Sequence, residues 1–293
     1  MNAGATVHRG FGLARSTWPE RIRTFWSMSW KTILEFSRYP IAFVALFAQV
    51  FLIMGMFLLA TVSFVGASTS PEAAAALPAF LAYGLVLNLF LGFTLWEIGF
   101  SIREEQVRGT LESLYLSPAN KFANLVSLIF AILLWTAVMC VAAVIVVGTV
   151  VGGLPTERPL FAFLVLALSI SGFLGIGFAF AGVTVKLKET AQFLVGFLQF
   201  FFLIFCAQFF PFAALPQPVV QYVSVWIPVS YDVDLFRTTL MGIQPELVSL
   251  GYVSYQMELV IVALFGALSP ILGYAFYRFI ERRARREGTL GEY

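Results

Sequence analysis

The side chains that could carry chemistry are few in this 293-residue chain, and their spacing argues against catalysis. The single histidine, His8, lies in the polar N-terminal segment, so no histidine-dependent triad, zinc site or intramembrane metalloprotease can be assembled. Cys140 and Cys206 fall inside apolar runs, which indicates buried, unreactive thiols. Asp232 and Asp234 form no evident acid–base pair, and we expect them to be solvated or to cap a helix. Catalysis by the chain itself is therefore not expected.

The sequence also contains no motif that predicts a cofactor site. No G-x-x-x-x-G-K-[ST] motif occurs, so the chain has no loop of the kind that cradles nucleotide phosphates. The run Gly172-x-x-Gly175-x-Gly177 lies in an apolar stretch with no strand before it, which indicates close helix packing rather than a nucleotide site. A net charge of +2 gives no case for nucleic-acid binding. We expect the chain to bind no cofactor, metal or nucleic acid.

Glu97 falls near the end of a long apolar stretch, where a charge is costly in lipid. It either snorkels or pairs near the interface beside Arg103, or it carries a proton, as in a proton-coupled secondary transporter. Glu258 begins another apolar stretch, and we expect it near the outer surface. Four amides inside apolar stretches can hydrogen-bond between helices or line a substrate path, namely Gln49, Asn88, Gln199 and Gln208.

The elements that must position these residues are membrane helices. Hydrophobic residues make up 60% of the chain and charged residues 12%, with a mean hydropathy of +0.88, whereas soluble domains carry roughly 25% charged residues. Irregular backbone cannot face lipid, so each long apolar stretch must be helical. The sequence predicts an all-α polytopic membrane protein with one domain over 1–293. Its six spans are predicted at Ile41–Phe64, Leu77–Ser101, Phe122–Val150, Leu160–Val185, Thr190–Phe212 and Glu258–Tyr277.

Lysine and arginine alternate between the segments that flank these spans. Of the 18 basic residues, 16 lie in the N-terminal segment, the second and fourth loops and the C-terminal tail. The other two are Arg158 and Arg237. The positive-inside rule then places both termini in the cytosol, which requires an even number of spans. The polar start has no apolar core beside a cleavage site, so we expect no signal peptide and a multi-pass protein of the plasma membrane.

The segment 18–38 is predicted to form a helix lying in the membrane interface. Thr17-Trp18-Pro19-Glu20 has the pattern of a capping box at its start. Its apolar face comprises Ile22, Phe25, Trp26, Ser29, Trp30, Ile33 and Leu34. Such an aromatic-rich face is typical of interfacial helices, with an ordinary soluble amphipathic helix as the alternative.

The second cytosolic loop, 103–118, is too regular to be a simple connector. An apolar ridge at i, i+4 and i+7 runs beside a column of charges, which predicts a short helix that ends at Pro118. The ridge comprises Val107, Leu111 and Leu114, and the column comprises Glu104, Arg108 and Glu112. A helix of this kind suits docking into a groove on a soluble partner. The alternative is a solvated turn whose ridge rests on the bilayer.

The same loop has a glutamate-rich start, then Gly-Thr-Leu-Glu, then Leu-x-Leu-Ser-Pro. The residues concerned are Glu104, Glu105, Gly109, Thr110, Leu111, Glu112, Leu116, Ser117 and Pro118. This pattern resembles the loop after the second span in permeases of the type-2 ABC exporter family. The resemblance extends to the amphipathic entry helix, the six spans, the proline-rich bend after the fifth span, and Pro228…Tyr231…Leu235-Phe236-Arg237…Gly242.

The resemblance implies a specific assembly. In that family two six-span units pair, and two ATPase subunits bind beneath them and hold the ATP and Mg²⁺. Because this chain has no phosphate-binding loop, it implies a separate ATPase chain, with a homodimer of permeases in membrane lipid. The external segment Ala213–Met257 would supply re-entrant helices. The residues implied to couple to the ATPase are Arg103, Glu104, Glu105, Val107, Arg108, Gly109, Thr110, Leu111, Glu112, Leu114, Leu116, Ser117 and Pro118.

The predicted fifth span carries phenylalanines at strict i+4 spacing, namely Phe193, Phe197, Phe201, Phe205 and Phe209. This row can stack on flat hydrophobic cargo, face lipid or pack at a dimer seam. Since the resemblance places this span beside a central cavity, the predicted substrate path comprises Asn88, Phe193, Phe197, Gln199, Phe201 and Phe205. Many aromatic residues and few charges favour a drug or lipid-like cargo, and a lipid-linked glycan is the main competing cargo. The alternative functions are a proton-coupled transporter that uses Glu97, and a membrane enzyme or scaffold.

Overall fold

The computed structural model describes residues 18–38, 40–65, 71–100, 121–151, 153–187, 190–242 and 250–287. Within these ranges the chain is helical and contains no strand. The longer helices are α1 (Trp18–Arg38), α2 (Pro40–Val65), α3 (Pro71–Phe93), α6 (Lys121–Val151), α7 (Pro159–Leu187), α8 (Ala191–Phe205), α10 (Pro228–Met241) and α11 (Tyr255–Glu287). The short elements are the π-helical turn η1 (Thr94–Ile98), η3 (Phe212–Ala214), α9 (Gln217–Tyr222) and η4 (Ser224–Trp226).

Four helices in the described part of the chain are long and apolar enough to cross a membrane. They cover Ala76–Ile98, Ser127–Thr149, Pro159–Thr184 and Tyr255–Arg283. These ranges coincide with the predicted second, third, fourth and sixth spans, so the chain is an all-helical, polytopic membrane protein. The apolar helix α2 covers the predicted first span.

The predicted fifth span, Thr190–Phe212, is too long. Helix α8 ends at Phe205 and has 15 residues, which at ~1.5 Å per residue is about 22 Å, less than the ~30 Å of a hydrocarbon core. The backbone turns at Ala207, which adopts a positive φ of 48°, a conformation that interrupts a right-handed helix. The predicted sixth span, Glu258–Tyr277, lies within α11, which begins at Tyr255 and continues to Glu287.

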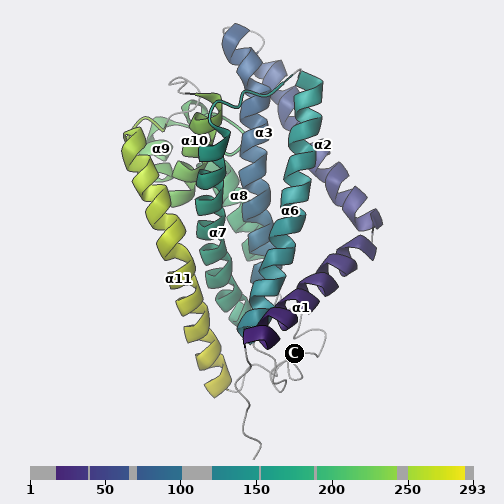
Figure 1. Cartoon of the computed structure of the whole chain (residues 1–293). Helices are drawn as coiled ribbons and strands as arrows, with labels where there is room; N and C mark the ends of the chain where they lie inside the picture. The colour runs from purple at the N-terminus through teal and green to yellow at the C-terminus, as the bar shows by residue number, and fades with distance from the viewer. Residues whose placement is uncertain are drawn as a thin grey trace, which may run out of the picture.

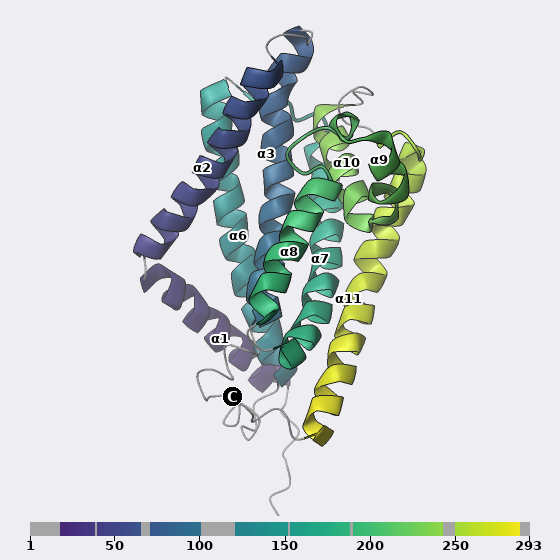
Figure 2. The same cartoon turned by 180° about the vertical axis from the view of Figure 1, so that it is seen from behind.

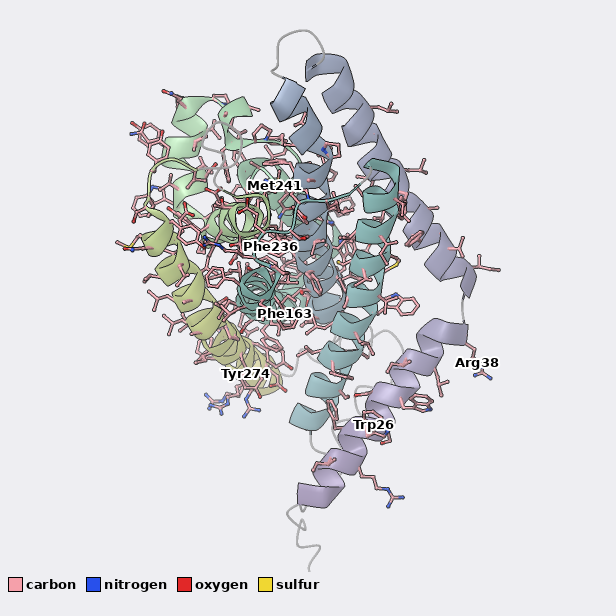
Figure 3. The ribbon with its side chains drawn as sticks, turned by 45° about the horizontal axis from the view of Figure 1, so that its top comes forward. Trp26, Arg38, Phe163, Phe236, Met241 and Tyr274 are labelled. Atoms are coloured by element: carbon pink, nitrogen blue, oxygen red, sulfur yellow. The ribbon has the colours of Figure 1, made fainter. Side chains whose placement is uncertain are left out.

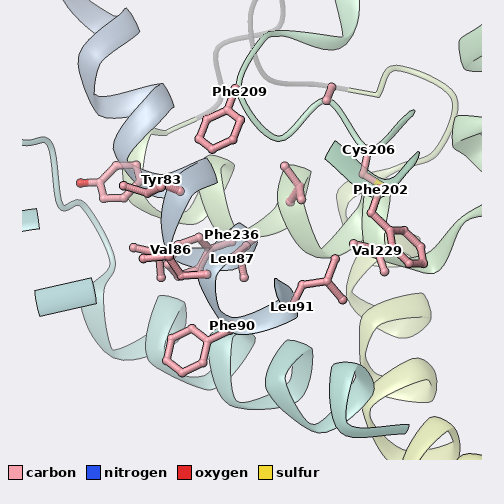
Figure 4. Close-up of a cluster of buried hydrophobic side chains, with 14 of the residues drawn as sticks. Tyr83, Val86, Leu87, Phe90, Leu91, Phe202, Cys206, Phe209, Val229 and Phe236 are labelled. Atoms are coloured by element: carbon pink, nitrogen blue, oxygen red, sulfur yellow. The ribbon is translucent and has the colours of Figure 1, made fainter. Parts of the chain in front are cut away.

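Helix α3 is the centre of the bundle (Figures 1 and 2). Its neighbours are α2, α6, α7, α8 and α10. Of the apolar stretch within Ala76–Ile98, 83% is buried, whereas only 17% is buried in the corresponding stretch of α11, within Tyr255–Arg283. The core side chains of α3 meet those that follow α8 and those of α10 (Figure 4). Labelled examples in that figure are Tyr83, Leu87, Phe209, Val229 and Phe236.

Helices α7 and α11 pack closely through small residues. A Cβ atom at Gly273 would collide with the backbone of Gly175. Two hydroxyl groups also bridge the pair: Ser171 Oγ donates to Gly266 O at 2.7 Å, and Ser269 Oγ donates to Gly172 O at 2.8 Å. The prediction that the glycine run of α7 serves helix packing is therefore confirmed.

We expect Gly273→Ala to lower the thermal midpoint of unfolding, because the added methyl group forces α7 and α11 apart at a cost of about 1–3 kcal/mol. Gly196→Ala is the matched control, since nothing lies within 4 Å of its Cβ position. There alanine should be neutral or stabilise α8 by up to about 1 kcal/mol. A thermal-unfolding series of the purified chain measures both, and equal midpoints for the two variants would contradict the packing argument.

Helix α1 lies at a slant across the lower end of α6 (Figure 1). Phe25 packs against Phe130 with ring centroids 5.5 Å apart, and the buried Ser29 Oγ donates to Ser127 O at 3.5 Å. The predicted helix 18–38 is therefore present, and only part of its apolar face packs on α6. Phe25 and Ser29 face α6, whereas four large apolar side chains stay exposed: Ile22, Trp26, Trp30 and Leu34. Figure 3 shows where Trp26 and Arg38 project from this helix. Its place in the membrane interface stays a prediction.

Candidate functional site

The predicted coupling segment, 103–118, lies outside the described residues, but the elements that flank it are described. Helix α3 with η1 runs down to it, and α6 starts after it at Lys121. The lower end of the bundle also holds α1, the end of α7 and the end of α11 (Figures 1 and 2). The described ends of α3 with η1, α6, α7 and α11 that flank the predicted cytosolic segments therefore lie together at one end of the bundle.

The turn η1 links this end of α3 to two other helices. Trp96 Nε1 donates to Gln199 Oε1 of α8 at 2.8 Å. Thr94 faces Gly177 of α7, where a Cβ atom would lie 2.7 Å from Thr94 Cγ2. π-Helical turns inside α-helices are frequent at functional sites. Sequence reasoning missed this turn, and its residue pattern carries no signal for it.

Two of the six predicted substrate-path residues are amides that bond between helices. Asn88 is buried, and its Nδ2 donates to Gln208 Oε1 at 2.5 Å. Gln199 accepts the Trp96 hydrogen bond. Glu97 lies in η1, half-buried, and Gln49 lies exposed on α2. Asn88, Gln199 and Gln208 thus hydrogen-bond between separate elements of the bundle, with Gln208 in the reversal after α8.

The other four path residues are phenylalanines of α8, and they do not share one face. Phe193 and Phe197 are 82% and 63% exposed, whereas Phe201 and Phe205 are half-buried with ring centroids 4.7 Å apart. Each i+4 step advances about 40° around a helix of 3.6 residues per turn. The row therefore winds from exposed positions at Phe193 and Phe197 to half-buried positions at Phe201 and Phe205. Phe209, which follows the end of α8, is buried.

A polar cluster around α10 is the most unusual feature of the described structure. Asp232, Asp234 and Arg237 are at most 1% exposed, so the expectation that the two aspartates are solvated is wrong. Glu258, in the first turn of α11, is 4% exposed, and its expected place near the outer surface of the membrane stays a prediction. The physical reason is that α10 packs against α3, α7 and α11 and is buried on nearly every side, so its charged side chains lie in the core.

Arg237 holds the chain reversal after α8. Its Nη1 donates to Ala207 O at 2.8 Å, and its Nη2 donates to Gln208 O. The guanidinium carbon lies 3.5 Å from the ring centroid of Phe80 on α3, a cation–π contact. Burial lowers the pKa of Arg237 to about 9, and the charge of Asp234 opposes that change. Gly84 of α3 leaves the room for this arrangement, since a Cβ there would collide with Gln208 O and Arg237 Nη2.

The aspartates bond to other elements. Ser169 Oγ of α7 lies 2.9 Å from Asp232 Oδ1, and Leu250 N donates to Asp234 Oδ2. Six buried polar atoms among the described residues have no hydrogen-bond partner: Gln208 Nε2, Ser224 Oγ, Ser230 Oγ, Asp232 Oδ2, Asp234 Oδ1 and Arg237 Nε. Within the described ranges no group of three histidine, cysteine or acidic residues could hold a metal ion. Cys140 and Cys206 are buried free thiols, as predicted.

The apolar helices indicate a membrane-embedded protein, and a family model shows that it is a membrane transport component of the ABC type. The model described as ABC-2 type transporter matches residues 23–241, and the chain belongs to this family. The match begins in α1, includes the segment 103–118 and ends with α10. Permeases of this family normally work with an ATPase subunit. A comparison with curated proteins gave no match.

Proposed function

We propose that this chain is the transmembrane permease of an ATP-driven exporter whose ATPase is a separate subunit. The observation that carries the proposal is the family match over 23–241, which includes the segment 103–118 between η1 and α6. Two permease chains and two ATPase subunits would assemble in the plasma membrane with both termini in the cytosol. ATP and Mg²⁺ would be bound by the ATPase, since this sequence has no phosphate-binding loop.

Motion at the segment 103–118 would enter the bundle through η1. The Trp96–Gln199 hydrogen bond would pass it to α8, and the contact of Thr94 with Gly177 would pass it to α7. A π-helical turn suits this role because its extra residue lets the lower part of α3 shift without breaking the upper part. Helix α8, with its exposed Phe193 and Phe197, would then move relative to α3.

The cargo that fits this chain best is hydrophobic or amphipathic, of drug or lipid type. The exposed side chains of α8 offer aromatic rings, which stack on flat apolar molecules. The charged residues of α10 are buried among α3, α7 and α11, so they do not present charge to a substrate.

The direct test reconstitutes the chain in vesicles with a candidate ABC ATPase subunit and measures ATP-dependent transport of a fluorescent amphiphile. Co-purification of the two chains and transport that stops without ATP are the expected results. If the chain transports the probe with a proton gradient alone, the ATP-driven assignment fails.

Glu97→Gln separates this function from a proton-coupled one. If ATP is the energy source, the neutral amide should leave ATP-dependent transport within about tenfold of wild type, equivalent to less than about 1.4 kcal/mol in activation free energy. Initial rates at equal protein incorporation measure this. Abolished transport that a Glu97→Asp variant restores would instead favour proton coupling.

A further inference from the structure

The carboxyl groups of Asp234 on α10 and Glu258 on α11 meet in the buried cluster. They are 1% and 4% exposed, and they lie in hydrogen-bonding contact with each other. Two ionised carboxylates cannot form such a bond, because neither carries a hydrogen. Leu250 N–H donates to Asp234 Oδ2, whereas no described group donates a hydrogen bond to Asp234 Oδ1. One proton shared between the two carboxyls provides the missing hydrogen.

A count of the buried charges leads to the same result. Arg237 is the one buried basic side chain in the described ranges, against three buried carboxyl groups around α10: Asp232, Asp234 and Glu258. If all three were ionised, the cluster would hold two negative charges without a counter-charge, which a low-dielectric interior disfavours strongly. Two bound protons make the cluster neutral.

The second proton belongs on Asp232. Ser169 Oγ lies 2.9 Å from Val165 O and 2.9 Å from Asp232 Oδ1, but a serine hydroxyl has one hydrogen to donate. When that hydrogen goes to Val165 O, the bond to Asp232 requires a protonated carboxyl as its donor. Burial raises the pKa of Asp232 well above its ordinary value.

We propose that Asp234 and Glu258 form a proton-binding site, and that the shared proton fastens α10 to α11. Without the proton, two carboxylates would face each other in the core, and the contact between the two helices would loosen. The site would make the packing of α11 on the bundle depend on pH.

The other titratable groups near the pair do not supply a replacement hydrogen. Tyr83 of α3 donates to Pro155 O, and Tyr231 of α10 donates to Val225 O. Cys206 is a buried free thiol, and α7 contributes the hydroxyl of Ser169 to the cluster. Glu157 near the end of α10 is exposed. Arg237 directs both terminal nitrogens to backbone carbonyls.

The direction of the pH effect follows from the carboxyl of Asp234. Burial raises its pKa to about 7, although the Leu250 N–H and the charge of Arg237 act in the opposite direction. The folded chain therefore binds more protons than the unfolded chain between the unfolded pKa of ~4 and the folded pKa. The free energy of unfolding falls as pH rises through this interval and stays low above it.

The test measures thermal unfolding of the full chain in nanodiscs of uncharged lipid, from pH 5 to pH 9, with Asp234→Asn, Glu258→Gln and the control Glu157→Gln. We expect the wild-type midpoint to be higher at pH 5 than at pH 9 by roughly 5 °C or more, and Glu157→Gln to behave like wild type. Either amide variant should reduce the pH dependence, because an amide N–H donates to the remaining carboxylate without a shared proton, and only the contribution of Asp232 remains.

Infrared spectroscopy provides a readout that a purely structural role would not change. Wild type should show the band of a buried carboxylic acid at pH 6, reduced in either amide variant, and this readout still applies if one variant fails to fold. A flat wild-type profile, an absent carboxylic acid band, or amide variants that keep the wild-type profile would each overturn the proposal. Stabilisation by sodium relative to choline, with no pH dependence, would assign the site to a cation and overturn it too. None of these readouts requires the ATPase or a substrate.

Discussion

Arg237→Ala is expected to destabilise the chain by about 3–5 kcal/mol, because it removes one partner of a buried charge network. The truncation leaves the carbonyl groups of Ala207 and Gln208 without their donors and Asp234 without its nearest positive charge. It also leaves a space beside the ring of Phe80. Thermal or denaturant unfolding of the purified chain measures the loss.

Two arginine variants sharpen this prediction. Arg237→Lys should give an intermediate loss, because lysine keeps the charge but lacks the planar fork that reaches two carbonyls. Arg278→Ala is the matched control, since Arg278 is exposed on α11 with its guanidinium carbon 5.9 Å from the Tyr274 ring centroid, and such contacts contribute at most about 1 kcal/mol. If Arg237→Ala is no more destabilising than Arg278→Ala, the guanidinium does not hold the reversal after α8.

Leu111→Asp is expected to abolish both co-purification with the ATPase and ATP-dependent transport. On the predicted helix 103–118, Leu111 is the middle residue of the apolar ridge, and an aspartate there would place an unpaired charge in a buried interface. A loss of more than about 1.4 kcal/mol is a loss of at least tenfold in affinity. Glu104→Lys should act in the same direction by reversing one charge beside the ridge.

The control for this prediction is Ser113→Asp, which adds the same charge on the side of the predicted helix away from the ridge. It should bind the ATPase like wild type. Affinity is measured by titrating the ATPase onto immobilised permease, and transport by the vesicle assay. If Leu111→Asp and Ser113→Asp bind and stimulate the ATPase alike, 103–118 is not the docking segment.

The first expected result concerns the fold and the second concerns the partner, and they are independent. Arg237 lies in the upper half of the bundle with α10 (Figure 1), whereas 103–118 joins the lower ends of α3 and α6. Arg237→Ala should therefore lower stability without removing the docking segment for the ATPase. Leu111→Asp should abolish binding of the ATPase without lowering stability.

The sequence by itself determined the class of protein and the approximate place of most helices. The length of an apolar stretch is enough to predict a helix, because each backbone polar group in lipid must be hydrogen-bonded within its own helix. The predicted second, third, fourth and sixth spans accordingly fall on helices α3, α6, α7 and α11. The pattern Gly-Thr-Leu-Glu within 103–118 was also enough to indicate the family that the match over 23–241 then showed.

Only the tertiary structure decided where the charges of α10 lie and where α8 ends. The partners of Asp232, Asp234 and Arg237 are Ser169, Leu250 N and the carbonyls after α8, which are distant in sequence and have no periodic relation to α10. Charge counting treats a basic residue outside the spans as solvated, and so it cannot recognise one that caps a buried turn. Likewise, the apolar composition continues past Phe205, and the helix stops there because the backbone reverses at Ala207 under the hydrogen bonds of Arg237.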